Sequence, residues 1–194
     1  NIGTSNNQFI YPQGIAFDSS SGTLYVADTG NHRVMQYSPN ALSGNVVAGG
    51  NGAGNGNTEL ANPTGIYFDS SSNSLIIANT GANNIVRWVL GDTNWTLIAG
   101  DINGVSGNTS TLLHEPYDVT LDSWGNVYVA DTYNNRIQFF LAGQSNGTAI
   151  AGDTNVYRSN STLLSYPYSL VLDAQLNLYV SDSLNFRIQK FAHY

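Results

Sequence analysis

Cysteine is absent from the 194-residue chain, and only 6 Lys and Arg stand against 13 Asp and Glu. Without cysteine no disulfide can form, so the sequence gives no sign of a redox compartment. The net charge of −7 opposes the phosphate backbone and anionic lipid, and no apolar run is long enough to span a bilayer. We therefore expect neither nucleic-acid binding nor membrane insertion.

The sequence shows no signal peptide and begins at Asn1. We therefore expect a processed or excised piece of a precursor. Gly, Asn, Ser and Thr are abundant, whereas charged residues make up only 10% of the chain. This composition is typical of many short strands joined by tight polar turns, so the first prediction is an all-β domain.

A pattern built around proline recurs four times, with its prolines at positions 12, 63, 116 and 167. A second apolar run follows each copy, at residues 24–28, 75–79, 127–131 and 178–182. These runs are β-branched or aromatic and too short for helices, so they indicate buried strands. Polar turns with a leading Asp separate the two runs, which predicts a hairpin in each copy.

Two further strands complete the unit. A third strand is predicted at residues 33–37, 84–88, 136–140 and 187–191, and a fourth at 46–49, 97–100 and 149–152. Repeated units of four antiparallel strands are typical of a β-propeller. We predict one propeller domain or fragment, with blades at about residues 8–50, 58–100, 111–152 and 162–194.

The segments 28–34 (Asp-Thr-Gly-Asn-His-Arg-Val) and 131–137 (Asp-Thr-Tyr-Asn-Asn-Arg-Ile) resemble the NHL repeat. The openings Pro-x-Gly-Ile-Ala-Phe-Asp and Leu-Tyr-Val-Ala-Asp-Thr are also similar to that family. The resemblance covers essentially the whole chain and implies an NHL-type propeller. These repeats are longer than is usual for the family, and four copies are fewer than such propellers usually close with.

The ends of the chain fall at unequal points of the repeat. Asn1 aligns with the loop after a fourth strand, and Tyr194 falls just after a third strand. The last blade is therefore predicted to lack its outer strand, and residues 1–7 are too polar and in the wrong register to supply it. The predicted open edge comprises Arg187, Ile188, Gln189, Lys190 and Phe191.

An open strand edge exposes unpaired backbone donors and acceptors, which proteins normally cover. We expect the missing strand to come from the rest of a longer parent chain or from a neighbouring copy by strand addition. Head-to-tail addition that fails to close would build a filament. The expected partner is therefore protein.

Acidic and basic residues recur five positions apart in three of the four copies. The pairs are Asp28 with Arg33, Asp131 with Arg136, and Asp182 with Arg187. In the second copy both charges are replaced, by Asn79 and Asn84. Loss of both together is what a direct ion pair requires, because a stranded buried charge is costly. A ring of catalytic or metal-binding carboxylates is the alternative, but structural pairs that brace the turn between the second and third strands are favoured.

Signals for catalysis are weak. The three histidines, His32, His114 and His193, have no metal-ligand spacing, and no Gly-x-Ser-x-Gly element occurs. The resemblance implies an alternative, since NHL-like propellers include an amidating lyase and lactonase-like hydrolases with metals near the central axis. No residue here matches such a site. We therefore assign no catalytic residue, cofactor or metal, and keep a propeller enzyme as the alternative.

Residues at the start of the first strand and in the turn before the third are the candidates for partner contact. They are Gln13, Thr64, Tyr117 and Tyr168, together with His32, Tyr133 and Phe186. Exposed aromatic residues suit recognition, although packing against the adjacent blade is the alternative.

Four sequons, at Asn94, Asn108, Asn146 and Asn160, fall on the predicted outer strands and their following loops. Glycans at such rim positions would be sterically tolerated. We expect an extracellular, non-catalytic interaction or structural scaffold that carries N-linked glycans.

Overall fold

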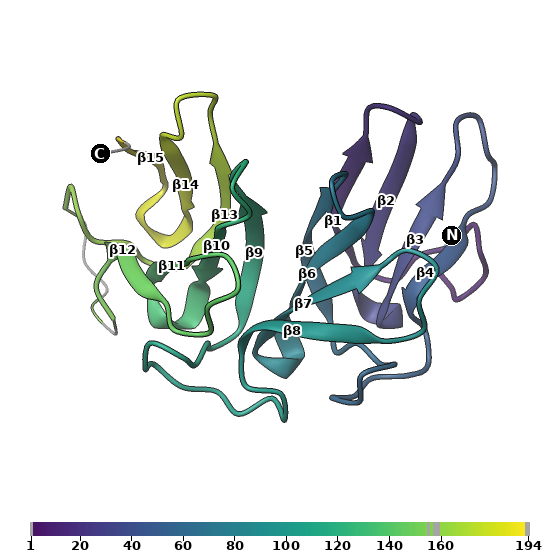
Figure 1. Ribbon diagram of the computed structural model, residues 1–194, viewed down its shortest axis with the longest axis horizontal. Coiled ribbons are helices and arrows are strands. Elements are labelled where there is room, and N and C mark those ends of the chain that lie inside the picture. Colours follow the sequence, from purple (N-terminus) through teal and green to yellow (C-terminus); the bar gives the residue numbers. More distant parts are fainter. Residues whose placement is uncertain (1, 155, 157–159, 193–194) are drawn as a thin grey trace.

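The computed structural model describes residues 2–154, 156 and 160–192, which form four antiparallel sheets (Figure 1). The first sheet contains β1 (Pro12–Asp18), β2 (Thr23–Asp28), β3 (Arg33–Tyr37) and β4 (Asn45–Gly49), and the second β5 (Pro63–Asp69), β6 (Ser74–Asn79), β7 (Asn84–Val89) and β8 (Trp95–Gly100). The third contains β9 (Pro116–Leu121), β10 (Val127–Asp131), β11 (Arg136–Phe140) and β12 (Thr148–Gly152), and the fourth β13 (Pro167–Leu172), β14 (Leu178–Asp182) and β15 (Arg187–Phe191).

The turn between the first two strands forms because an aspartate caps it. In the first sheet, the Asp18 carboxylate accepts hydrogen bonds from the Ser20 NH at 2.9 Å and the Ser20 hydroxyl at 2.6 Å. Asp69 holds Ser71 in the same way. This is an Asx turn, and it sets the hairpin register that the sequence predicts.

The turn between the second and third strands is a single 3-10 turn followed by one left-handed residue. The turns are η1 (Thr29–Asn31), η2 (Thr80–Ala82), η3 (Thr132–Asn134) and η4 (Ser183–Asn185). The left-handed residue is His32, Asn83, Asn135 or Phe186, with φ between 54° and 57°. The described residues contain no α-helix, and none of their helical turns is long and apolar enough to cross a membrane.

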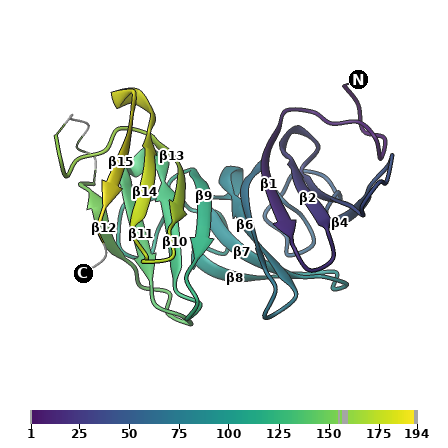
Figure 2. The ribbon, with the colours of Figure 1, turned by 90° about the horizontal axis from the view of Figure 1, so that it is seen from above.

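The sheets pack face to face in chain order. β1 contacts β5, β5 contacts β9, and β9 contacts β13, so the first strands line a common axis. The sheets fan out from β1–β4 at the right to β13–β15 at the left (Figure 1), and the view from above places the first and last sheets at opposite ends of the row (Figure 2). The expected arrangement of four propeller blades, the last with three strands, is confirmed.

Three apolar cores lie between consecutive blades, and each combines one face of a blade with the opposite face of the next. Val34 of the first blade and Ile66 of the second belong to one core, Ile85 and Val119 to the next. Glycine permits this close packing near the axis: a Cβ on Gly14 would lie 2.1 Å from the Thr64 carbonyl oxygen. The interior of the protein is therefore a repeated contact between blades.

Candidate functional site

The three expected ion pairs are present; all three aspartates are buried, whereas the Arg187 side chain is 29% exposed. Arg Nε lies 2.7 Å from the aspartate Oδ2 in Asp28–Arg33, 2.8 Å in Asp131–Arg136 and 2.7 Å in Asp182–Arg187. The second aspartate oxygen accepts a backbone NH from the loop before the first strand, at 2.8 Å from His114 N in the third blade. Burial raises the pKa of Asp131, while Arg136 and the Asn134 amide oppose that rise.

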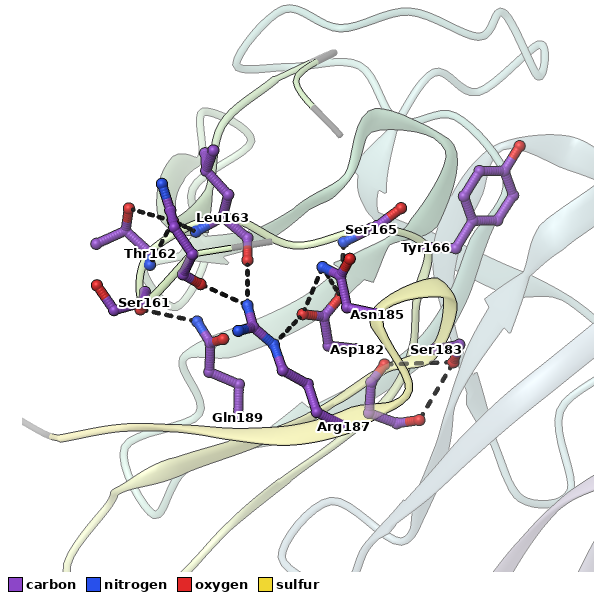
Figure 3. Close-up of polar contacts among 12 residues, drawn as sticks. Ser161, Thr162, Leu163, Ser165, Tyr166, Asp182, Ser183, Asn185, Arg187 and Gln189 are labelled. Atoms are coloured by element: carbon purple, nitrogen blue, oxygen red, sulfur yellow. Dashed lines mark hydrogen bonds and ion pairs between the residues drawn. The ribbon is translucent and has the colours of Figure 1, made fainter. Parts of the chain in front are cut away.

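The arginines also bind the loop that precedes their own blade. Arg136 donates to the carbonyls of Asn108, Thr109 and Leu112 at 2.8–3.1 Å. Figure 3 shows the same arrangement around Arg187, which donates to Asp182 and to loop carbonyls. The pairs therefore brace this loop as well as the turn between β-strands.

The sequence reasoning missed the third member of each group, an asparagine three residues after the aspartate. Asn31 and Asn134 each donate to the aspartate Oδ2 at 2.8 Å, and Asn185 donates to Asp182 at 2.9 Å. The signal was available, because Asp-x-x-Asn-x-Arg recurs in three copies and Ala82 stands in the second.

The second blade binds its preceding loop without an aspartate–arginine pair. The Oδ1 of Asn79 still accepts the Ala61 NH at 2.7 Å. In place of an arginine, the Trp95 indole NH donates to the carbonyls of Gly56 at 3.1 Å and Glu59 at 2.9 Å. These carbonyls occupy the repeat positions of Thr109 and Leu112, so Trp95 binds the loop carbonyls that Arg136 binds in the third blade.

Four of the candidate contact residues meet where the inner strands converge. Gln13, Thr64, Tyr117 and Tyr168 line a hollow of about 130 Å³. Thr64, however, is only 3% exposed, and its hydroxyl donates to the Tyr117 carbonyl at 2.7 Å. Its assignment as a partner contact is wrong, because residues at this repeat position differ in how closely the next blade covers them.

Tyrosines and one carboxylate give this axial hollow its chemistry. The ring centroids of Tyr117 and Tyr168 lie 4.5 Å apart. Burial, together with the neighbouring Tyr168, raises the pKa of Tyr117 to about 12. Burial also raises the pKa of Asp118, although its carboxylate accepts the Ser169 hydroxyl at 2.7 Å and the Leu170 NH at 3.1 Å. The described residues contain no group of three or more His, Asp or Glu placed to hold a metal.

The other three candidates lie in different environments. His32 accepts the Asn62 NH at 3.1 Å, a bond between blades that Asn83 and Asn135 repeat. Tyr133 packs against His114 and Tyr166 but is 37% exposed. Phe186 is 92% exposed. His32 therefore joins two blades, while Phe186 remains accessible; His193 lies outside the described residues.

The outward faces of the first and last blades expose side chains that the inner blades bury. Ile15 is 68% exposed, whereas Ile66, Val119 and Leu170 at the same repeat position are 3–6% exposed. Ile188 is 69% exposed, whereas Val34, Ile85 and Ile137 are fully buried. Sequence reasoning placed Ile188 only on the open edge and missed Ile15, although the repeat register identifies both.

The first blade's outward face also contains a hollow of about 390 Å³, lined by Phe9, Leu24, Val26 and Tyr37 among others. On the last blade, Val171 is 58% exposed and lies on the same outward face as Ile188. The outward surface of the first blade around Ile15 and this hollow, and the outward surface of the last blade around Val171 and Ile188, are here called the end faces.

The edge of β15 has no further strand beside it among the described residues. Arg187, Ile188, Gln189, Lys190 and Phe191 lie along this edge, and Gln189 turns inward to donate to the Ser161 carbonyl at 2.8 Å. All four sequon asparagines, Asn94, Asn108, Asn146 and Asn160, are exposed. The Asn160 side-chain oxygen accepts the Thr162 NH at 2.9 Å.

This architecture defines a β-propeller, and comparison with known proteins identifies its repeats. The NHL repeat family matches residues 9–37 and 113–140. Two of the four blades, the first and the third, thus match the NHL repeat, within a four-blade propeller arrangement. It is 24% identical to Protein SUPPRESSOR OF QUENCHING 1, chloroplastic, of Arabidopsis thaliana, over 94% of this chain and 20% of that protein.

Solved structures share the fold at low sequence identity. A gluconolactonase from Xanthomonas campestris has a TM-score of 0.73 at 18% identity, over 97% of this chain and 60% of that one. A chain of a nidogen–laminin complex has a TM-score of 0.70 at 19% identity, over 95% of this chain and 60% of that one. The chain therefore spans little more than half the length of these structures.

Proposed function

We propose that the protein is a non-catalytic interaction and structural scaffold that assembles head to tail through its end faces. The observation that carries this proposal is the contrast between Ile15 and Ile188 and their buried counterparts. In each internal core, the counterpart of Ile188 packs in the same cluster as the next blade's counterpart of Ile15. The end faces are thus the two halves of a contact that the chain already makes three times.

Polar contacts between blades support the same pairing. The Thr29 hydroxyl donates to the Pro63 carbonyl at 2.7 Å, and Thr80 and Thr132 repeat this bond to the next blade at 2.6 Å. Ser183 occupies the same position in the last blade, and the Pro12 carbonyl is the matching acceptor on the first. A second copy would complete this hydrogen bond.

The energetics favour a contact of moderate strength. Full burial of an aliphatic or aromatic side chain contributes about 1.5–3 kcal/mol, and several are exposed on each end face. Phe186 cannot accept the hydrogen bond that His32, Asn83 and Asn135 accept between blades, so a contact between copies lacks one bond. Association itself costs about 4–15 kcal/mol, so concentration should control assembly.

Light scattering over a wide concentration range tests this proposal. The expected result is a mass that rises with concentration and falls to the monomer in Ile15→Asp and in Ile188→Asp. Leu42→Asp is the matched control, because Leu42 is 92% exposed in the loop between β3 and β4. A monomeric wild type, or a control variant that dissociates equally, would refute the proposal.

Extracellular placement with glycans at the four sequons belongs to the same proposal. The exposed asparagines support it, as does the fold shared with a chain of a nidogen–laminin complex. The chain carries −7 net charge, which disfavours nucleic acid as the partner and leaves protein.

A propeller enzyme domain with an axial metal is the second candidate function. Asp118 favours it, since this carboxylate lies beside Tyr117 and Tyr168 in the axial hollow, and the fold is shared with a gluconolactonase. Elemental analysis discriminates the two: stoichiometric metal that disappears in Asp118→Asn would favour the enzyme.

A further inference from the structure

The edge of β15 has three structural templates within the same chain. In the first three blades, the third strand pairs with an outer strand, namely β4, β8 or β12. Each outer strand has the same register, with Gly opposite the first residue of the third strand and Ala opposite the second. In the last blade the corresponding residues are Arg187 and Ile188.

The three outer strands share a sequence pattern. They read Asn-Val-Val-Ala-Gly at 45–49, Thr-Leu-Ile-Ala-Gly at 96–100 and Thr-Ala-Ile-Ala-Gly at 148–152. From this pattern, we infer that the β15 edge binds an extended segment of sequence Asn/Thr-aliphatic-Val/Ile-Ala-Gly, paired antiparallel. This inference rests on the proposed interaction function and names the chemistry of a partner.

Backbone geometry requires the glycine. Gly49, Gly100 and Gly152 have φ between 67° and 87°. A Cβ on them would lie 2.2–2.5 Å from the carbonyl oxygen of His32, Asn83 or Asn135, respectively. Phe186 occupies this position in the last blade with φ 55°, like the 54–57° of its counterparts, so its carbonyl is placed to meet the incoming strand in the same way.

In the first three blades, packing against the next blade requires the alanine. Ala48, Ala99 and Ala151 are 1–5% exposed, each in a core that also contains a fully buried leucine of the next blade's preceding loop. These leucines are Leu60, Leu113 and Leu164. A larger side chain at this position would overfill the contact between blades.

The last blade also offers a loop carbonyl that can bind the first residue of the inferred segment. In the first three blades, the residue that begins the outer segment donates its NH to a loop carbonyl, that of Asn6, Asn57 or Ser110, at 2.8 Å. Ser161 carries the matching carbonyl in the last blade. It accepts Gln189, but Ser110 likewise accepts Gln138 while it holds the outer strand.

A groove of about 540 Å³ lies between β12 and β15 and continues this site. Ile150, Leu178 and Phe191 contribute its apolar wall. Residues 1–11 contain no Ala-Gly pair, so they do not carry the pattern. The occupant we infer is a protein segment of the stated sequence that lies outside residues 1–194.

The test uses a fluorescently labelled peptide with the sequence of residues 146–153, Asn-Gly-Thr-Ala-Ile-Ala-Gly-Asp. Anisotropy measures its binding to the wild-type chain, and hydrogen exchange locates it. We expect saturable binding with slowed exchange of the amides at residues 187–191 and no change at 136–140, which β12 already covers. Binding without protection of 187–191, or no binding, overturns the inference.

Peptide variants supply the matched controls without changing the protein. Val in place of the glycine should weaken binding at least about tenfold, because the left-handed conformation costs an L-residue about 1–2 kcal/mol before any clash. Val in place of the isoleucine should bind like the parent, because β4 carries Val47 at this position. Equal binding of the glycine variant overturns the inference.

Self-association, measured by light scattering on the same preparation, separates the two claims. Assembly without peptide binding refutes the strand acceptor and leaves the scaffold proposal standing. Peptide binding by a strictly monomeric chain refutes head-to-tail assembly and supports the strand acceptor.

Discussion

One prediction concerns the Asp131–Arg136 pair, because the second blade shows a natural replacement of both charges, by Asn79 and Asn84. Arg136→Asn leaves the Asp131 carboxylate, which is 0% exposed, without its counter-charge. Removing one member of a buried pair costs about 3–5 kcal/mol of unfolding free energy. Asp131→Asn should be similarly costly, because Arg136 is itself only 4% exposed.

The double variant Asp131→Asn/Arg136→Asn reproduces the pair that the second blade carries at Asn79 and Asn84. Asn at 131 retains the oxygen that accepts the His114 NH, as Asn79 does for Ala61. The remaining loss is the three bonds from Arg136 to loop carbonyls and its 3.2 Å bond to the Thr154 hydroxyl. The loop is largely exposed, so water replaces these bonds, and we expect a total cost of about 1–3 kcal/mol.

Urea unfolding followed by tryptophan fluorescence measures the cycle, since Trp88 and Trp95 are buried. The expected coupling is at least about 2 kcal/mol, with the double variant more stable than either single variant. If the losses of unfolding free energy in the two single variants simply add up in the double variant, the two charges do not stabilise each other. That result would refute the explanation that both charges are kept or lost together.

Three further predictions concern separate parts of the chain. Against the effect of burial, hydrogen bonds from Ser71, Ser72 and Arg87 lower the pKa of Asp69 to about 2. The stabilisation is therefore present above the ordinary value of 3.8 and lost as pH falls through about 2. Asp69→Asn should cost about 1 kcal/mol in urea unfolding at neutral pH, after solvent screening, and almost nothing below pH 2; an equal cost at both would contradict the assignment. Gly152→Ala should lower stability by at least about 1–2 kcal/mol, because φ is +77° and the added Cβ meets the Asn135 carbonyl; a neutral effect would contradict the template on which the strand acceptor rests. Secretion from a glycosylating host should yield a product whose mass falls after N-glycosidase treatment, and an unchanged mass would contradict glycans at Asn94, Asn108, Asn146 and Asn160.

Alignment of the four repeats predicts much of the fold because the sequence features that define each repeat lie close together in the chain. The proline, the Asx-turn aspartate and the Asp-x-x-x-x-Arg spacing each act within a single blade, so four aligned copies indicate the strands, turns and ion pairs. The same alignment places the missing strand beside residues 187–191, and the described sheet has three strands there.

The candidate site was harder to predict, because exposure depends on neighbours from other blades. Thr64 and Tyr168 share a repeat position, yet one is 3% and the other 42% exposed. His32 bonds to Asn62 across a blade boundary, which its own repeat does not reveal. The repeat register identifies the residues of the end faces, but only once the order in which the blades pack is known.

Disulfide trapping tests head-to-tail assembly most directly, because the chain contains no cysteine. Ile15→Cys and Ile188→Cys are mixed and oxidised under mild conditions, with Leu42→Cys as the exposed control. We expect the mixed disulfide between positions 15 and 188 to form faster than either homodimer or any pair with position 42. Indiscriminate cross-linking, or none between 15 and 188 at concentrations where the protein associates, would contradict it.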